Sequence, residues 1–309
     1  MKTAIIGIGG VGGYYGGKLA LRYSASDEHD VFFVARGDHL ERIRHNGLKL
    51  ITPEETLTVL PSLATDDPRE LGSLDLVVLC VKGYALDTAS RSIADNLHVD
   101  SIVIPLLNGV DNAERLTALL PRGIILNGCV YISSHIVGPG VIEQVGGSGK
   151  LLFGPEDRPS APFSNIESIL KNAGINAVLS DTIAVDVWSK YLFVGPLGSI
   201  TSMTGKSLGE IMENDRYRTM LEKMMREVET IAQAKDIPLP DTIVQQSLDI
   251  TANFPYETKT SLQLDFEKGR QTEIETFTGY VVMTGRVLGI ETPLHNEVYS
   301  ALQQKIKTG

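Results

Sequence analysis

Residues 2–23 read KTAIIGIGGVGGYYGGKLALRY, a short apolar run that leads directly into a glycine-rich turn and then into a helical stretch. Gly7 permits the tight turn, Gly9 lets the backbone approach a ligand without a Cβ, and Gly12 allows close contact between helix and strand. The order strand, glycine turn and helix is the context in which Gly-x-Gly-x-x-Gly has predictive value. The segment therefore predicts a dinucleotide site, because a helix N-terminus offers amide donors and a partial positive charge to a pyrophosphate. We expect the cofactor to contact Gly7, Ile8, Gly9, Gly10, Val11 and Gly12.

Residues at the ends of two later strands indicate which dinucleotide binds. The apolar run 31–34 ends in Ala35-Arg36, where an NAD-selective site would present an acid to the ribose hydroxyls. An arginine pairs instead with a 2′-phosphate, so NADPH is favoured over NADH; an ordinary surface arginine is the alternative. Lys82 follows the run 76–81, at the edge where open parallel sheets bind ligands. It is expected either to support phosphate binding or to be a solvated lysine.

The pattern further along the chain predicts an α/β domain over residues 1–180 and a helical domain over residues 181–309. Short apolar runs alternate with helical stretches in the first part, as in a parallel sheet covered by helices. The expected strands are 3–6, 30–35, 74–81, 101–105, 124–129 and 176–179, with a helix at 165–172 and a hairpin formed by 141–145 and 150–153 across the glycines of 146–149. The second part carries a methionine-containing helix over 210–235 and a helix from a Thr272/Glu275 capping box to about residue 288.

Composition excludes several classes of protein. Of 309 residues, 28 are Lys or Arg and 38 are Asp or Glu, so the net charge is 28 − 38 = −10 and nucleic acid or an anionic membrane is disfavoured as a partner. Cys80 and Cys129 stand far apart and the histidines show no ligand spacing, so no metal site is expected. No apolar run approaches the roughly 20 residues of a membrane span, and the N-terminus lacks a signal-peptide pattern. We expect a cytoplasmic protein with a small-molecule substrate.

Taken together, these residues resemble the ketopantoate reductases, also called 2-dehydropantoate 2-reductases, over essentially the whole chain. The resemblance rests on the glycine motif, Arg36 followed by Asp38-His39-Leu40, Val81-Lys82, Leu107-Asn108-Gly109-Val110, Trp188-Ser189-Lys190, and Ser261 through Thr272-Glu273-Ile274-Glu275. It implies NADPH-dependent reduction of ketopantoate to pantoate in pantothenate biosynthesis. It also implies a Rossmann-type N-terminal domain and an all-α C-terminal domain similar to that of 6-phosphogluconate dehydrogenase, with the active site between them.

The same resemblance implies that Lys190 is the general acid and that Glu273 is its catalytic partner. The sequence gives Lys190 separate support, because its neighbours Trp188, Tyr191 and Leu192 are apolar or aromatic. A lysine in such a segment either extends to water or lies in a cleft where desolvation lowers its pKa. Hydride transfer to a ketone leaves charge on oxygen, which a protonated amine stabilises and then neutralises. For Glu273, favourable charge near a helix N-terminus is the structural alternative.

Three further residues are assigned by resemblance. Ser261 and Asp265, four residues apart on an expected helix, match the family's substrate-binding serine and its neighbouring aspartate. Asn108 is expected near the nicotinamide ribose and the catalytic lysine, in contact with both cofactor and substrate. Without the resemblance, surface polarity would explain the first two residues, and a turn before Gly109 would explain Asn108.

The sequence departs from the family at two positions. Val194 and Gly198 stand where ketopantoate-reducing members often carry asparagines that hold the substrate. Neither residue supplies those hydrogen bonds, so a reductase of a different 2-oxo acid is the first alternative. A non-catalytic NADP(H) sensor is the alternative from another class, and retention of Lys190, Ser261 and Glu273 argues against it. A homodimer and a monomer are equally compatible with the sequence.

Overall fold

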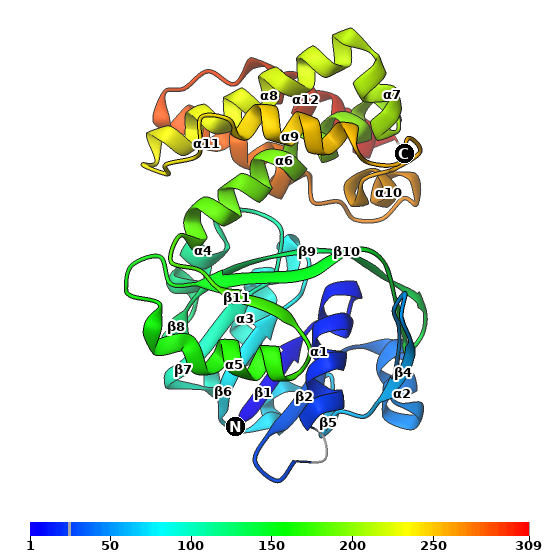
Figure 1. The fold of residues 1–309 in the computed structure, drawn as a ribbon, viewed down its shortest axis with the longest axis vertical. Coiled ribbons are helices and arrows are strands. Elements are labelled where there is room, and N and C mark those ends of the chain that lie inside the picture. Colours follow the sequence, from blue (N-terminus) through cyan, green and yellow to red (C-terminus); the bar gives the residue numbers. More distant parts are fainter. Residues whose placement is uncertain (24–25, 309) are drawn as a thin grey trace. The chain divides into compact units, whose positions relative to one another are not determined.

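The computed structural model describes residues 1–23 and 26–308, which form two compact units (Figure 1). The first unit contains Met1–Leu107 and Asp111–Ile183. The second contains the chain from Ala184 onward together with the short segment Asn108–Val110. This segment therefore groups with the helical unit, although it lies in sequence between two elements of the first unit.

A six-stranded parallel sheet forms the centre of the first unit, with strand order β5-β2-β1-β6-β7-β8. Its strands are β1 (Lys2–Ile6), β2 (Asp30–Val34), β5 (Leu63–Thr65), β6 (Leu74–Leu79), β7 (Leu97–Pro105) and β8 (Ile124–Ile125). The chain proceeds from β1 to one side and later returns to place β6 on the other side of β1. This reversal is a topological switch point, and open parallel sheets bind ligands beyond the carboxyl ends of the strands at such a point.

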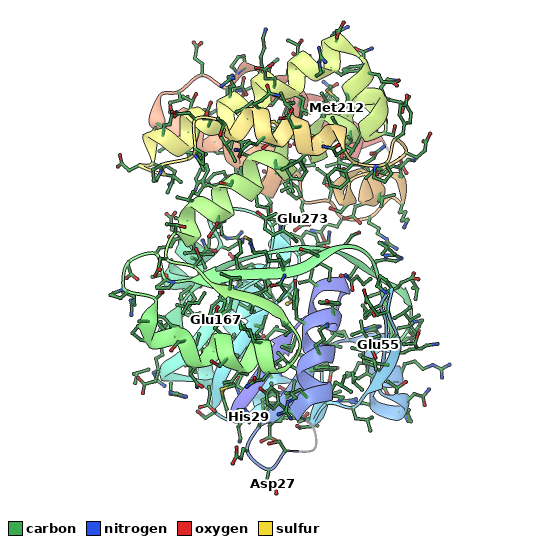
Figure 2. The ribbon with its side chains drawn as sticks, in the orientation of Figure 1. Asp27, His29, Glu55, Glu167, Met212 and Glu273 are labelled. Carbon is green, nitrogen blue, oxygen red and sulfur yellow. The ribbon has the colours of Figure 1, made fainter. Side chains whose placement is uncertain are left out.

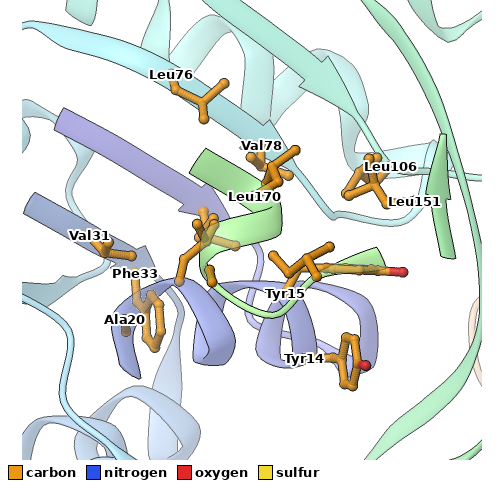
Figure 3. Packing of buried hydrophobic residues seen from close by; sticks show 14 of the residues in the cluster. Tyr14, Tyr15, Ala20, Val31, Phe33, Leu76, Val78, Leu106, Leu151 and Leu170 are labelled. Carbon is orange, nitrogen blue, oxygen red and sulfur yellow. The ribbon is translucent and has the colours of Figure 1, made fainter. Parts of the chain in front are cut away.

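A second sheet shares the first unit and has strand order β11-β10-β3-β4, with β9 paired to β10. Its strands are β3 (Leu48–Ile51), β4 (Thr56–Val59), β9 (Asn127–Gly138), β10 (Val141–Gly154) and β11 (Asn176–Leu179). Helix α1 (Gly10–Tyr23) packs against both sheets. A Cβ at Gly16 would lie 3.0 Å from Ile5 of β1, and a Cβ at Gly13 would overlap Ile142 of β10. Because Gly13 and Gly16 have no side chain, α1 lies close to both sheets, around the core shown in Figure 3.

The remaining helices of the first unit follow the βα pattern. Helices α3 (Leu86–Ile93) and α4 (Asn112–Leu119) cover the other face of the parallel sheet through a separate apolar cluster. Helix α5 (Ser164–Asn172) packs into the same core as α1, and α2 (Gly37–Asn46) follows β2. Short 3-10 turns occur at Pro68–Leu71, Gly83–Ala85, Ala94–Asn96 and Ala161–Phe163.

All regular elements of the second unit are helices in the part of the chain that the structure describes. Its elements are α6 (Ile183–Thr204), α7 (Leu208–Glu213), α8 (Asp215–Ala234), α9 (Ile243–Ala252), α10 (Ser261–Glu267), a π-helical turn (Glu275–Gly279), α11 (Tyr280–Leu288) and α12 (Pro293–Thr308). Met224 and Met225 of α8 are fully buried in its core, so these two methionines serve packing. No helix in the described part of the chain is long and apolar enough to span a bilayer. The predicted fold class, a Rossmann-type domain followed by helices, is confirmed.

One predicted motif of the first unit is wrong. Residues 141–145 and 150–153 do not pair with each other as a hairpin, because both belong to the continuous strand β10 and pair with β9. The register between β9 and β10 shifts on both sides of Gly146. Glycines inside a strand often mark bulges, and here they bend the ribbon instead of reversing it. The predicted strand 124–129 is likewise divided between β8 and β9, and the sequence analysis missed β3, β4 and β5.

Two helices of the second unit also differ from expectation. The predicted helix 210–235 is interrupted at Asn214, whose side chain accepts hydrogen bonds from the amides of Arg216 and Tyr217 and so begins α8. The Thr272/Glu275 capping box does not form, since helical structure begins at Ile274 and the Glu275 carboxylate accepts hydrogen bonds from the Tyr299 hydroxyl at 2.8 Å. A local cap thus decides the first boundary, whereas at the second a tyrosine from α12 binds the glutamate of the expected box.

Candidate functional site

The glycine turn lies at the carboxyl end of β1, beside the switch point of the parallel sheet. Gly7 has a φ of +93°, and its amide donates to the Val34 carbonyl at 3.0 Å. A Cβ at Gly7 would lie 2.9 Å from Val81 Cγ1, so both conformation and space require glycine there. A Cβ at Gly12 would overlap the Gly7 carbonyl oxygen. The helix can therefore begin directly against the end of the strand.

Gly9 differs from the other glycines of the turn. A Cβ placed there would meet no atom within 4 Å, and the Gly9 carbonyl accepts the Gly13 amide at 2.8 Å in the first turn of α1. Gly9 thus borders open space at a helix N-terminus, where a pyrophosphate fits. By contrast, a Cβ at Gly10 would overlap the Ser134 carbonyl of β9, and Ile8 is buried. Packing alone therefore accounts for the residue type at Gly10.

Arg36 and Lys82 lie on opposite sides of this turn. Arg36 follows β2 as the residue that precedes α2; its side chain is exposed, and its guanidinium makes no hydrogen bond or ion pair with the rest of the described chain. Lys82 follows β6, precedes the 3-10 turn Gly83–Ala85 and is half-buried. Because β2 and β6 both neighbour β1, each cation stands at the edge where β1 presents its glycines. The residues present fit a dinucleotide with an additional phosphate.

His39 was named above only as part of the motif Asp38-His39-Leu40, but in the structure its side chain makes a hydrogen bond. Its Nδ1 accepts a hydrogen bond from the Gly140 amide at 3.0 Å, which joins α2 to the turn between β9 and β10. An accepting Nδ1 requires the proton of the neutral ring to be on Nε2. Burial lowers the pKa of His39 below its usual value of 6.5. The neutral ring therefore holds the turn between β9 and β10 against α2.

Lys190 is the central charged residue of the second unit. It is half-buried on α6, and its Nζ donates a hydrogen bond to Asn108 Oδ1 at 3.0 Å. Asn108 belongs to the segment after β7 that groups with this unit. Apolar side chains adjacent to Lys190, including Trp188 and Leu192, are buried in the helical core. The ammonium group is thereby held by a neutral acceptor, an arrangement suited to donating a proton to a bound ligand.

The other predicted residues of the second unit lie in different environments. Glu273, labelled in Figure 2, is 4% exposed and immediately precedes the start of helical structure at Ile274. On α10, Asp265 is 9% exposed whereas Ser261 is exposed, so a spacing of four residues does not give them equal burial. Thr260 begins α10, and its hydroxyl pairs with that of Thr201 of α6 at 2.8 Å. Helix α10 is therefore fixed against the helix that carries Lys190.

Val194 and Gly198 follow Lys190 at intervals of four residues on α6 and share its face. Val194 is half-buried. A Cβ at Gly198 would lie 3.5 Å from Leu262 Cβ, which is ordinary van der Waals contact. Neither residue brings a hydrogen-bonding side chain to this face. Among the described residues, no group of three or more His, Cys, Asp or Glu side chains is arranged to hold a metal ion.

Comparisons with known proteins identify the family. Residues 3–158 match the family model described as "Ketopantoate reductase PanE/ApbA", and residues 182–306 match "Ketopantoate reductase PanE/ApbA C terminal". A Mesorhizobium japonicum protein named 2-dehydropantoate 2-reductase is 30% identical, over 98% of this chain and 97% of the relative. An oxidoreductase of Bacillus subtilis, YkpB, is 27% identical over 98% of both chains.

A solved structure agrees with this assignment. The PanE/ApbA family ketopantoate reductase from Ralstonia eutropha superposes with a TM-score of 0.90 at 28% identity, and 99% of each chain is covered. The predicted enzyme class and nicotinamide cofactor are both confirmed by the match. This chain belongs to the ketopantoate reductase family, a family of NADPH-dependent oxidoreductases.

Proposed function

We propose that this chain reduces the ketone of a 2-oxo acid with NADPH, and that ketopantoate is its first candidate substrate. The product would then be pantoate, and we propose that the enzyme acts in the cytoplasm on the route to pantothenate. The hydrogen bond from Lys190 Nζ to Asn108 Oδ1 carries the proposal. The neutral Asn108 side chain fixes the direction of the half-buried ammonium group. A general acid that protonates an alkoxide needs such a fixed direction.

In this proposal Lys190 acts on the oxygen of the ketone. NADPH, when bound, supplies a hydride to the carbonyl carbon. As the C=O π electrons move onto oxygen, the Lys190 ammonium stabilises the growing charge and then transfers one proton from Nζ. Asn108 accepts one of the other Nζ protons and so fixes the direction of the side chain. The 2-hydroxy acid and the neutral amine result.

The remaining residues bind and orient the reactants. Around the dinucleotide, Gly9 leaves open space at the N-terminus of α1 and Arg36 offers an exposed guanidinium to the 2′-phosphate, with Lys82 as a second cation. On the substrate side, Glu273 is assigned as the carboxylate partner of the reaction, and Ser261 and Asp265 as substrate-binding groups. The location of Glu273, buried and in the same unit as Lys190, supports this role.

A 2-oxo acid with an apolar side chain is the second candidate substrate. Val194 and Gly198 give the Lys190 face of α6 an apolar character. A site without a polar partner for a substrate hydroxyl gains little from that hydroxyl and accepts an analogue that lacks it. On this account the substrate carbon chain, rather than its hydroxyl, would lie against these two residues.

The test follows NADPH absorbance with purified protein and a panel of 2-oxo acids. Ketopantoate is compared with 2-oxoisovalerate, which lacks the hydroxymethyl group, and with phenylpyruvate. Val194→Asn is assayed in parallel, with the exposed Val99→Asn in the first unit as its matched control. If ketopantoate is the substrate, it has the highest kcat/KM of the panel. If the apolar candidate is correct, 2-oxoisovalerate or phenylpyruvate leads, and Val194→Asn alone shifts preference toward ketopantoate. NADPH binding without turnover of any 2-oxo acid would contradict both candidates and favour a sensor.

A further inference from the structure

The segment that follows Glu273 does not form a regular α-helix. In a regular helix the Tyr280 amide would donate to the Thr276 carbonyl, four residues before it. Here the Tyr280 amide donates to the Glu275 carbonyl, five residues before it, and Glu275–Gly279 form a π-helical turn. The Thr276 carbonyl thus loses the amide donor that a regular helix would provide. Single π-helical turns are rare and frequently lie at functional sites.

A side chain from α6 supplies a replacement donor. The Tyr191 hydroxyl shares its one proton between the Thr276 carbonyl at 2.9 Å and the Phe277 carbonyl at 2.8 Å. Tyr191 is 1% exposed, and its ring packs edge-on against Trp188 and Tyr280. A buried carbonyl without a partner is costly, so this hydroxyl stabilises the irregular turn.

Two further residues on the same face of α6 also lie against the π-helical turn. Gly195 is four residues after Tyr191, and a Cβ there would lie 3.7 Å from the Phe277 carbonyl oxygen. Ser199, four residues later, has its Oγ 2.7 Å from Thr278 Oγ1. Tyr191, Gly195 and Ser199 therefore set the distance and register between α6 and this turn. Lys190 is the residue before Tyr191 on the same helix.

The π-helical turn is also connected to Glu273. The Phe277 amide donates to the Glu273 carbonyl at 3.1 Å, while the Phe277 carbonyl accepts the Tyr191 hydroxyl. One peptide segment thus links the backbone of Glu273 to a side chain adjacent to Lys190. We infer that Tyr191 is a positioning residue, whose hydroxyl holds the π-helical turn so that Glu273 keeps its place relative to Lys190. The inference rests on the proposed roles of Lys190 and Glu273.

Tyr191→Phe tests this inference, because it removes the hydroxyl and keeps the buried ring. Tyr299→Phe is the matched control, since the Tyr299 hydroxyl binds the Glu275 carboxylate of the same turn at 2.8 Å but comes from α12. We expect Tyr191→Phe to lower kcat roughly 10-fold, because small displacements of catalytic groups are costly. NADPH affinity should stay within about twofold of the parent value in both variants, and Tyr299→Phe should keep kcat within about twofold.

A double-mutant cycle separates positioning from a general loss of stability. If Tyr191 acts through Glu273, Tyr191→Phe has little further effect on kcat in a Glu273→Gln background. Equal kcat losses in the two tyrosine variants, or additive losses with Glu273→Gln, would overturn the inference. Should Tyr191→Phe not fold, Ser199→Ala removes the neighbouring contact of α6 with Thr278 of the same turn, and the same non-additivity is expected.

Failure of the proposed function gives a different pattern. If Glu273→Gln and Lys190→Ala both keep full activity, the proposed roles are wrong and the inference is overturned with them. If both variants are slow while Tyr191→Phe retains the parent kcat, only the positioning role is overturned.

Discussion

The start of α1 in the first unit and the contacts of α6 in the second are built in opposite ways. At α1, backbone meets backbone: a Cβ at Gly12 would overlap the Gly7 carbonyl oxygen, five residues away in sequence. At α6, side chains bind segments that are remote in sequence, with Lys190 82 residues from Asn108 and Tyr191 86 residues from Phe277. A local pattern therefore encodes the glycine turn, whereas tertiary packing assembles the predicted acid and its surroundings.

Gly12→Ala and Gly9→Ala test the account of the glycine turn at the start of α1. We expect Gly12→Ala to have the largest effect on the free energy of unfolding. Gly12→Ala forces α1 away from β1, so the free energy of unfolding should fall by about 3 kcal/mol or more. Gly9→Ala adds a methyl group where nothing lies within 4 Å, so stability should change by less than about 0.5 kcal/mol. Chemical denaturation measures both variants.

The same pair of variants separates packing from ligand binding. Folded Gly9→Ala should bind NADPH at least roughly 10-fold more weakly, because its methyl group occupies space that the pyrophosphate would take. Unchanged NADPH affinity in Gly9→Ala would show that the open space beside Gly9 does not receive the cofactor. Similar stabilities of the two variants would contradict the close contact at Gly12.

Arg36→Ala is a second test in the first unit, beside the glycine turn. Because the guanidinium makes no ion pair with the described residues, its removal should leave stability unchanged. The loss of a charge-assisted contact with the 2′-phosphate should weaken NADPH by about 10- to 100-fold and leave NADH unaffected. Binding titrations with the two cofactors measure this selectivity. An equal loss for both would remove Arg36 from the phosphate site.

Asn108→Ala is the corresponding change on the α6 side. It removes the acceptor 3.0 Å from Lys190 Nζ, and kcat should fall roughly 10-fold as the ammonium loses its fixed direction. The KM for NADPH changes much less if Asn108 acts chiefly through Lys190. Steady-state kinetics measure both, with Asn253→Ala on the exposed end of α9 as a control. A loss confined to the KM for NADPH would assign Asn108 to the cofactor alone.

His39→Gln gives the smallest expected effect and tests a side-chain contact in the first unit. Because burial lowers the pKa of His39 from 6.5, the unfolded chain takes up the proton first as the pH falls. Stability is then full above pH 6.5 and decreases below it. His39→Gln should flatten this dependence and, at pH 8, cost about 1 kcal/mol through a weaker contact with Gly140. An unchanged slope between pH 5 and 7 would contradict this assignment.

The comparison also explains what the sequence could predict. The glycine turn was predicted because its residues are adjacent and each spacing has a steric reason. The continuous strand β10 was missed because its glycines form bulges, whose register depends on the partner strand β9. The π-helical turn and the Tyr191 contacts had no local signal, since a hydroxyl from another helix stabilises them. Family resemblance indicated Lys190 and Asn108, and only the structure shows their contact.

Lys190→Ala tests the central claim most directly, with turnover of the preferred 2-oxo acid measured at saturating NADPH and NADPH affinity measured in the same preparation. Lys206→Ala, which removes a half-buried lysine paired with Glu210, is the matched control. The account predicts that Lys190→Ala lowers kcat by roughly 100-fold or more, whereas its NADPH affinity stays close to that of the parent and of the control. Full turnover in Lys190→Ala, or a loss explained entirely by weaker NADPH binding, would contradict it.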